Sequence, residues 1–116
     1  MSTATTKSAP KTKRTQPRPR LNLAKAQQML RAQLPLLRDH YGVSALWLFG
    51  SYVRGEQRSR SDLDVLVEFA RTPTLWEFSA LQRHLSSTLG LSVDLVMKSA
   101  LKPAIGRQIL DEAVPL

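Results

Sequence analysis

Apolar residues at helical spacing predict a first helix over residues 21–41. They recur every three or four positions and would form one stripe: Leu23, Ala26, Leu30, Leu34 and Leu37. Asn22 is expected to cap the start of this helix, and Gly42 to end it. Pro35 removes a backbone donor inside the segment, so we expect it to kink the helix or to split off its last turn.

Two more helices are predicted nearer the C-terminus. Residues 72–88 carry an apolar stripe of leucine and phenylalanine, and Gly90 follows as a stop. The last helix is predicted over residues 98–113, with Pro103 near its first turn, where proline is tolerated.

Three apolar runs predict strands over residues 45–49, 63–69 and 91–97. The first run contains no polar residue, so we expect that strand to be buried on both faces. The resulting order is helix, strand, strand, helix, strand, helix. This order predicts a mixed α/β (α+β) fold, in which helices pack on a small mixed sheet.

Length and composition narrow the class of protein. A chain of 116 residues forms one domain, and without cysteine it has no disulfide framework and no thiolate metal site. Only His40 and His84 could ligate zinc, and they lie far apart in the sequence. No apolar run reaches membrane-spanning length, and the N-terminus lacks the apolar region of a secretory signal. We therefore expect a cytoplasmic protein with no membrane contact.

The positive charge is concentrated at the N-terminus. Of the net charge of +8, residues 1–20 contribute six basic side chains and no acidic one. With almost no large apolar residue, this tail is predicted to be disordered, and residues 21–116 to form the domain. The tail could make weak contact with nucleic acid, or it could be a solvated extension that aids solubility.

A pair of carboxylates marks the second predicted strand. Asp62 and Asp64 are two residues apart, so on a strand both side chains would point to one face. Carboxylates held this close raise each other's pKa unless a cation lies between them, and hard oxygen ligands suit Mg²⁺. The alternative is that Arg58 or Arg60 in the preceding loop forms a salt bridge with them.

Asp94 repeats this pattern in the third strand. It is the one charge in an otherwise apolar run, where burying it unpaired would be costly. If this strand lies beside the strand of Asp62 and Asp64, three carboxylates meet at one or two metal ions. That arrangement is the one used in two-metal phosphoryl and nucleotidyl transfer.

The turn after the first strand could bind phosphate. Gly50 would let the backbone approach a phosphate closely, and Ser51 would begin a short helix that offers its hydroxyl and N–H groups. Arg54, one turn further, could add a charge-assisted contact. Alone, a Gly-Ser pair is more often an ordinary turn; the two aspartates that follow favour the binding hypothesis.

These residues together resemble a known family. Gly50-Ser51, ten residues and then Asp62-Leu63-Asp64 is similar to the signature of the DNA polymerase β-like nucleotidyltransferase superfamily. The fuller segments 48–56 and 61–69 resemble its minimal nucleotidyltransferase branch, the MNT or MntA-like proteins. The resemblance covers about residues 23–114 and omits the tail.

The resemblance implies a function. MntA-like proteins are antitoxins that transfer AMP from ATP to a tyrosine of a partner toxin, an RNase with a HEPN domain. By this resemblance Asp62, Asp64 and Asp94 would hold two Mg²⁺ ions, and Gly50 and Ser51 would grip the nucleotide. Asp94 would also accept the proton of the attacking hydroxyl.

Two other functions stay open. An antitoxin could neutralise the toxin by stoichiometric binding alone, although the complete set of three aspartates argues against this. A small-molecule nucleotidyltransferase of the aminoglycoside type is disfavoured, because the chain has no room for a second substrate-binding domain.

Overall fold

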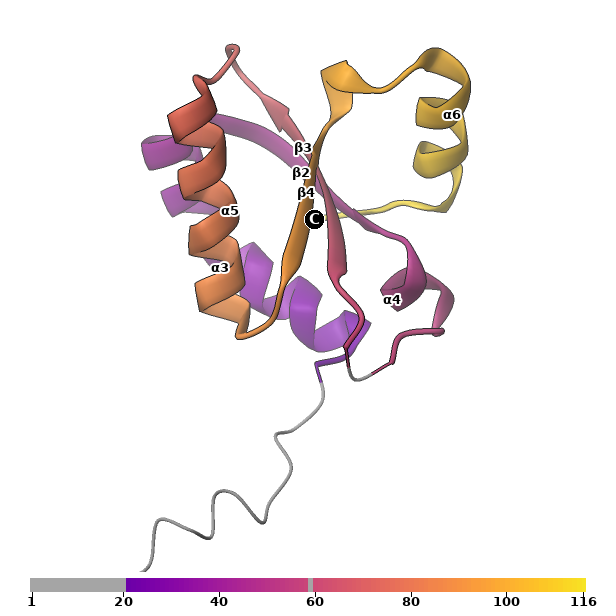
Figure 1. Ribbon diagram of the computed structural model, residues 1–116. Helices are drawn as coiled ribbons and strands as arrows, with labels where there is room; N and C mark the ends of the chain where they lie inside the picture. Colours follow the sequence, from indigo (N-terminus) through magenta and orange to yellow (C-terminus); the bar gives the residue numbers. More distant parts are fainter. Residues whose placement is uncertain (1–20, 59) are drawn as a thin grey trace, which may run out of the picture.

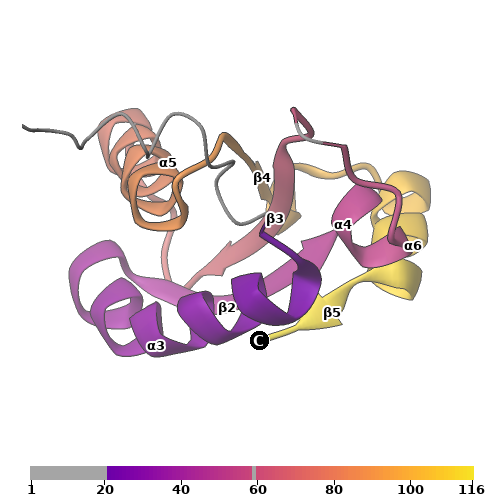
Figure 2. The same ribbon diagram turned by 90° about the horizontal axis from the view of Figure 1, so that it is seen from below.

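A four-stranded mixed sheet forms the centre of the fold, in a computed structural model that describes residues 21–58 and 60–116. The strands are β2 (Val43–Phe49), β3 (Leu63–Phe69), β4 (Val93–Met97) and β5 (Val114–Pro115), in the order β4-β3-β2-β5; Figure 1 labels the first three and Figure 2 labels all four. β3 and β4 run parallel, whereas β2 is antiparallel to both of its neighbours. The mixed α/β fold is therefore confirmed. The tail, residues 1–20, lies outside the described residues.

Helices lie on both sides of this sheet (Figures 1 and 2). α3 (Leu23–Tyr41) and α5 (Leu75–Leu89) contact each other and cover one face. The short α4 (Ser51–Arg54) and α6 (Pro103–Glu112) lie on the other side, and the 3-10 turn η2 (Lys98–Ala100) follows β4. Among the described helices, none is long and apolar enough to cross a membrane.

The predicted helix caps of α3 form as expected. The Asn22 side chain accepts a hydrogen bond from the N–H of Lys25, and Gly42 ends the helix with φ of 68°. α3 continues through Pro35 without a break, so the expectation that its last turn splits off is wrong. Packing of Leu37, which is fully buried two residues further on, outweighs the hydrogen bond that proline removes.

Alternating strand residues build the core against α3 and α5. Cross-strand partners on this face are apolar, as in the pairs Leu48–Val65 and Leu46–Val67. They join the buried side chains of α3 and α5: Ala26, Leu30, Leu37, Leu81, Leu85 and Leu89. Because side chains two apart share a face, the residues between them must point to the other side of the sheet.

That other face carries a second, smaller apolar row. The register aligns Trp47 of β2 with Leu66 of β3, and Leu66 with Val96 of β4. Leu66 is fully buried but lies outside the main core cluster. Trp47 is only half-buried, with the Lys98 ammonium 5.1 Å from its ring centroid, so β2 is buried on both faces only in part.

The C-terminal region differs from the prediction in two ways. The last helix begins at Pro103 rather than at residue 98, because proline occupies the N1/N2 position and a 3-10 turn precedes it. The short strand β5 was not predicted. It has only two residues, one of them proline, so it shows no alternating pattern.

Candidate active site

One cross-strand row on the α6 side of the sheet contains two of the three predicted metal-binding residues. The register places Asp64 of β3 beside Asp94 of β4 on one side and beside Phe49 of β2 on the other. Asp62 directly precedes β3, close enough for its charge to act on Asp64. The prediction that the strand of Asp94 lies next to the strand of Asp62 and Asp64 is therefore confirmed.

The Asp64 carboxyl lies partly buried between other charged groups. The pKa of Asp64 is raised to about 6, first of all by partial burial and then by the negative charges of Asp94 and Asp62. Hydrogen bonding with Asp94 also contributes to the rise, whereas the positive charge of Arg54 opposes it. A cation bound nearby would stabilise the ionised form of the Asp64 carboxyl.

The surroundings of these carboxylates differ from two of the expectations. Asp94 is exposed rather than buried, because β4 is an edge strand and its side chain lies on the more open face. The ion pairs among the described residues include neither Asp62 nor Asp64, so the alternative of a salt bridge with Arg58 or Arg60 is wrong.

The donor chemistry fits Mg²⁺, although the protein alone does not complete a metal site. No three histidine, cysteine, aspartate or glutamate side chains within the described residues form a group that could hold a metal ion. Mg²⁺ commonly takes only one or two carboxylates and fills its remaining positions with water and substrate phosphates. The adjacent carboxylates of Asp64 and Asp94 match that requirement.

Gly50 lies directly against Asp64. Its φ is 81°, and a Cβ at this position would overlap the Asp64 carboxylate. The Gly50 carbonyl accepts hydrogen bonds from the N–H groups of Val53 and Arg54, which closes the turn of α4. Ser51 begins α4, as predicted. Because Gly50 directly precedes it, the turn lies in contact with the Asp64 carboxylate. Glycine is thus required here by an internal contact, in addition to the reason inferred from the sequence.

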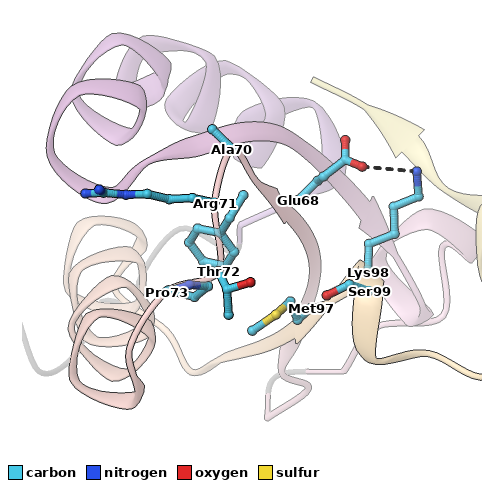
Figure 3. A pocket seen from close by; sticks show the side chains of 9 residues that line it. Glu68, Ala70, Arg71, Thr72, Pro73, Met97, Lys98 and Ser99 are labelled. Atoms are coloured by element: carbon cyan, nitrogen blue, oxygen red, sulfur yellow. Dashed lines mark ion pairs between the residues drawn. The ribbon is translucent and has the colours of Figure 1, made fainter.

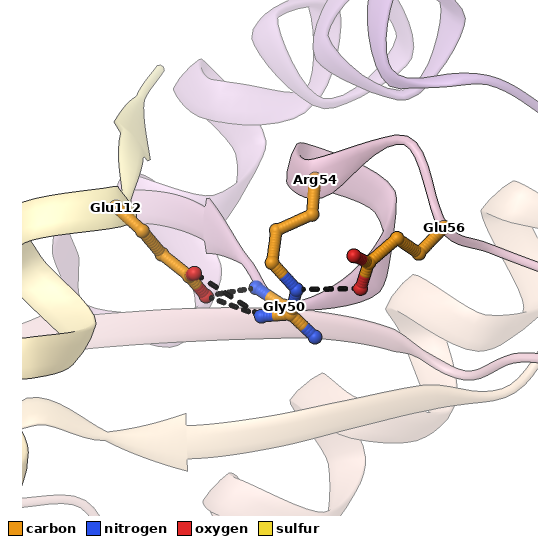
Figure 4. A network of polar contacts seen from close by, with 4 residues as sticks. All are labelled: Gly50, Arg54, Glu56 and Glu112. Atoms are coloured by element: carbon orange, nitrogen blue, oxygen red, sulfur yellow. Dashed lines mark hydrogen bonds and ion pairs between the residues drawn. The ribbon is translucent and has the colours of Figure 1, made fainter.

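Arg54 is held by two glutamates, one of which the sequence analysis missed (Figure 4). Its Nε donates to Glu56 at 2.8 Å, and its Nη1 donates to both carboxylate oxygens of Glu112 at 3.1 Å. Glu112 also accepts the N–H of Gly50 at 2.8 Å. Hydrogen bonds with Glu56 and then Glu112 raise the pKa of Arg54. Glu112 lies 58 residues beyond Arg54, and no local pattern connects the two.

A separate pocket lies at the other end of the parallel strands (Figure 3). It encloses about 370 Å³ and is lined by residues 68–73 and 97–99, at the C-terminal ends of β3 and β4. Asp64 and Asp94 are near the N-terminal ends of the same strands. The candidate active site is thus on the face of the sheet and apart from this pocket.

Known proteins share both the sequence and the fold. A family model described as a nucleotidyltransferase domain matches residues 30–116. The protein adenylyltransferase MntA of Thermococcus cleftensis is 46% identical over 94 residues, which cover 81% of this chain and 95% of that protein.

Two solved structures support the same assignment. A structure described as that of a minimal nucleotidyltransferase is 38% identical, has a TM-score of 0.72, and matches over 83% of this chain and 97% of its own. An MNT antitoxin complex with the tri-AMPylated HEPN toxin of Shewanella oneidensis gives 26% identity and a TM-score of 0.58. That match covers 78% of this chain and 70% of the other. From motif, fold and relatives, the chain belongs to the minimal, MntA-like branch of the nucleotidyltransferase family and is a nucleotidyltransferase.

Proposed function

We propose that this chain is an antitoxin that transfers AMP from ATP to a tyrosine hydroxyl of a HEPN-type RNase toxin, with Mg²⁺ as cofactor. The observation that carries the proposal is the contact of the Gly50 turn with Asp64, which itself lies beside Asp94. This arrangement brings a group that can grip phosphate next to groups that can bind a cation. The relatives point to the same donor and partner, because one is an adenylyltransferase and another occurs with an AMPylated toxin.

The chemistry requires positioning of the nucleotide and removal of one proton. Gly50 and Ser51 would hold the triphosphate so that its α-phosphorus lies over the carboxylate row, and Arg54 would contribute positive charge nearby. The tyrosine oxygen forms a bond to the α-phosphorus, the bond from that phosphorus to the bridging oxygen breaks, and pyrophosphate leaves. Asp94, exposed on the same face, is placed to accept the phenolic proton.

Asp64 and Asp94 would hold the Mg²⁺, with Asp62 adding its negative charge nearby; the ion, when bound, would neutralise charge on the phosphates and on these carboxylates. The raised pKa of Asp64 fits this role, because the carboxyl releases its proton more readily when a cation is present.

The test combines the purified chain, a HEPN-type toxin, ATP and Mg²⁺. Intact-mass spectrometry should show one or more AMP units added to the toxin, and peptide mapping should place them on tyrosine. The modified toxin should remain inactive as an RNase after separation from the antitoxin. Asp64→Asn, or chelation of the metal, should abolish the added mass, with a loss of about a hundredfold or more in rate.

Occlusion without chemistry predicts a different result. In that case a variant with Asp62, Asp64 and Asp94 all changed to asparagine would neutralise the toxin as well as the native chain. The native mixture would also show no added AMP. That pair of results would replace transfer with stoichiometric binding.

A further inference from the structure

Three hydrogen bonds converge on the Glu112 carboxylate at the edge of the candidate active site (Figure 4). Oε2 accepts the Gly50 N–H at 2.8 Å, and both oxygens accept from Arg54 Nη1 at 3.1 Å. Glu112 is at the end of α6, whereas Gly50 and Arg54 begin and end the turn of α4. One side chain thus ties the last helix to both ends of that turn.

Strand pairing brings the segment that follows Glu112 next to β2. β5 pairs with β2 through Leu48–Val114 and Trp47–Pro115. Glu112 ends α6 two residues before β5, and Gly50 directly follows β2, so this pairing brings the two segments together. The carboxylate is held by its hydrogen bonds to Gly50 and Arg54, and its side chain is only 30% exposed. A group anchored in this way is a fixed part of the turn rather than a mobile one.

The other partner of Arg54 is held less firmly. The Glu56 side chain is 63% exposed and lies only two residues away, so its ion pair with Arg54 contributes little to the geometry. Glu112 shares its charge with a backbone N–H as well, and charge-assisted hydrogen bonds of this kind are about twice as strong as neutral ones. Of the two acids, Glu112 is the one able to fix the turn.

We propose that Glu112 is a positioning residue, which holds Arg54 and the Gly50 amide so that the turn stays in place against Asp64. Gly50 contacts the Asp64 carboxylate directly, so a small displacement of the turn alters the space between nucleotide and metal ligands. The proposal rests on the proposed function, because it assigns to Glu112 a part in preparing the same nucleotide site.

The experiment measures MgATP binding to the full chain by calorimetry, without toxin. Glu112→Gln keeps an oxygen acceptor for the Gly50 amide but removes the charge that holds Arg54, and should weaken MgATP binding about tenfold. Glu112→Ala removes both contacts and should weaken binding further. Asp111→Asn, an exposed neighbour on the same helix, is the matched control and should bind MgATP as the native chain does.

A double-mutant cycle shows whether Glu112 acts through Arg54. If it does, Arg54→Met and the double variant Arg54→Met/Glu112→Gln should bind MgATP with nearly equal affinity. A merely structural role would lower the unfolding temperature of Glu112→Gln while leaving its MgATP affinity native, and that result would overturn the proposal. Tighter binding by Glu112→Ala would overturn it too, because Glu112 would then compete with the nucleotide.

The binding assay also separates this proposal from the proposed function. A chain that binds MgATP, responds to Glu112→Gln, and yet adds no AMP to any HEPN toxin would retain the role of Glu112 and refute protein adenylylation. If the native chain transfers AMP, and Glu112→Gln has the same transfer rate and MgATP affinity, protein adenylylation is retained and the role of Glu112 is refuted. A native chain that binds no MgATP would refute both.

Discussion

Asp64 is the residue at which burial, two other carboxylates and the Gly50 turn meet. Its pKa rises from 3.8 to about 6. Between these values the folded chain keeps a proton that the unfolded chain has lost, so the stability of the fold decreases as pH rises through this range. Above about pH 6 the carboxyl is ionised in both states, and the full destabilisation is present.

Replacing this carboxyl should therefore stabilise the metal-free protein at neutral pH. With a chelator at pH 7, Asp64→Asn should unfold a few degrees above the native chain, on the order of 1 kcal/mol once solvent screening is allowed for. The difference should vanish below pH 4. Thermal denaturation across this pH range is the measurement, with Asp111→Asn as the control. A gain that is constant with pH would contradict the explanation by ionisation.

The contact of Gly50 with Asp64 gives a second prediction at this scale. Gly50→Ala should lose most of its MgATP affinity, because its Cβ would displace the Asp64 carboxylate. Gly42→Ala is a suitable control, since Gly42 also has a positive φ but has nothing within 4 Å of the added Cβ. It should lose only about 1–2 kcal/mol of stability. Equal MgATP affinity in the two variants, by calorimetry, would refute the contact.

The sequence was a good guide to the residues that carry local signals. The spacing of Asp62 and Asp64, and the isolation of Asp94 in an apolar run, predicted that these three carboxylates come from neighbouring strands. Glu112 was not predictable, because its partners Gly50 and Arg54 lie 62 and 58 residues away and no local pattern connects them. The metal-ligand roles of the three aspartates and the nucleotide roles of Gly50, Ser51 and Arg54 stay predictions.

At the scale of elements, the boundaries were predicted best where a cap defines them. α3 begins after Asn22 and ends at Gly42, and α5 ends at Gly90, as the sequence indicated. The start of α6 was misplaced because residues 98–100 form a separate 3-10 turn, and the helix begins only at Pro103. Strand pairing could not be derived from periodicity, which carries no information about neighbours.

The start of α5 offers a test of capping that is independent of function. The Thr74 hydroxyl accepts the N–H of Glu77, whose carboxylate accepts the N–H of Thr74. Thr74→Ala should lower the free energy of unfolding by about 1 kcal/mol and leave MgATP binding unchanged. Ser87→Ala, at an exposed site of the same helix, should be neutral or slightly stabilising. Urea denaturation gives both values, and equal losses would refute the cap.

At the scale of the whole molecule, residues 1–20 stand apart from the domain in composition. Deleting them should change the unfolding temperature and the rate of AMP transfer by no more than a conservative surface substitution does, because they supply almost no apolar surface. Calorimetric melting and the mass-spectrometric transfer assay are the measurements. A marked drop in unfolding temperature would mean that the tail packs on the domain.

The same deletion distinguishes the two roles left open for the tail. If its six basic residues contact nucleic acid, the native chain should bind single-stranded RNA at low salt, and the truncated chain should bind it more weakly. Fluorescence anisotropy with a labelled RNA gives the comparison. If the native and truncated chains give the same RNA anisotropy at every salt concentration, solubility is left as the role of the tail.

The two tryptophans lie in environments that make them unequal optical reporters. Trp47 is half-buried on the face that carries Asp64, two residues before Phe49 of the carboxylate row, whereas Trp76 at the start of α5 is 80% exposed. Emission from Trp76 should be readily quenched by iodide and insensitive to ligands at the far end of the strands. A Trp76→Phe chain would thus leave one fluorophore beside the site, so that nucleotide binding could be followed in real time without any attached dye.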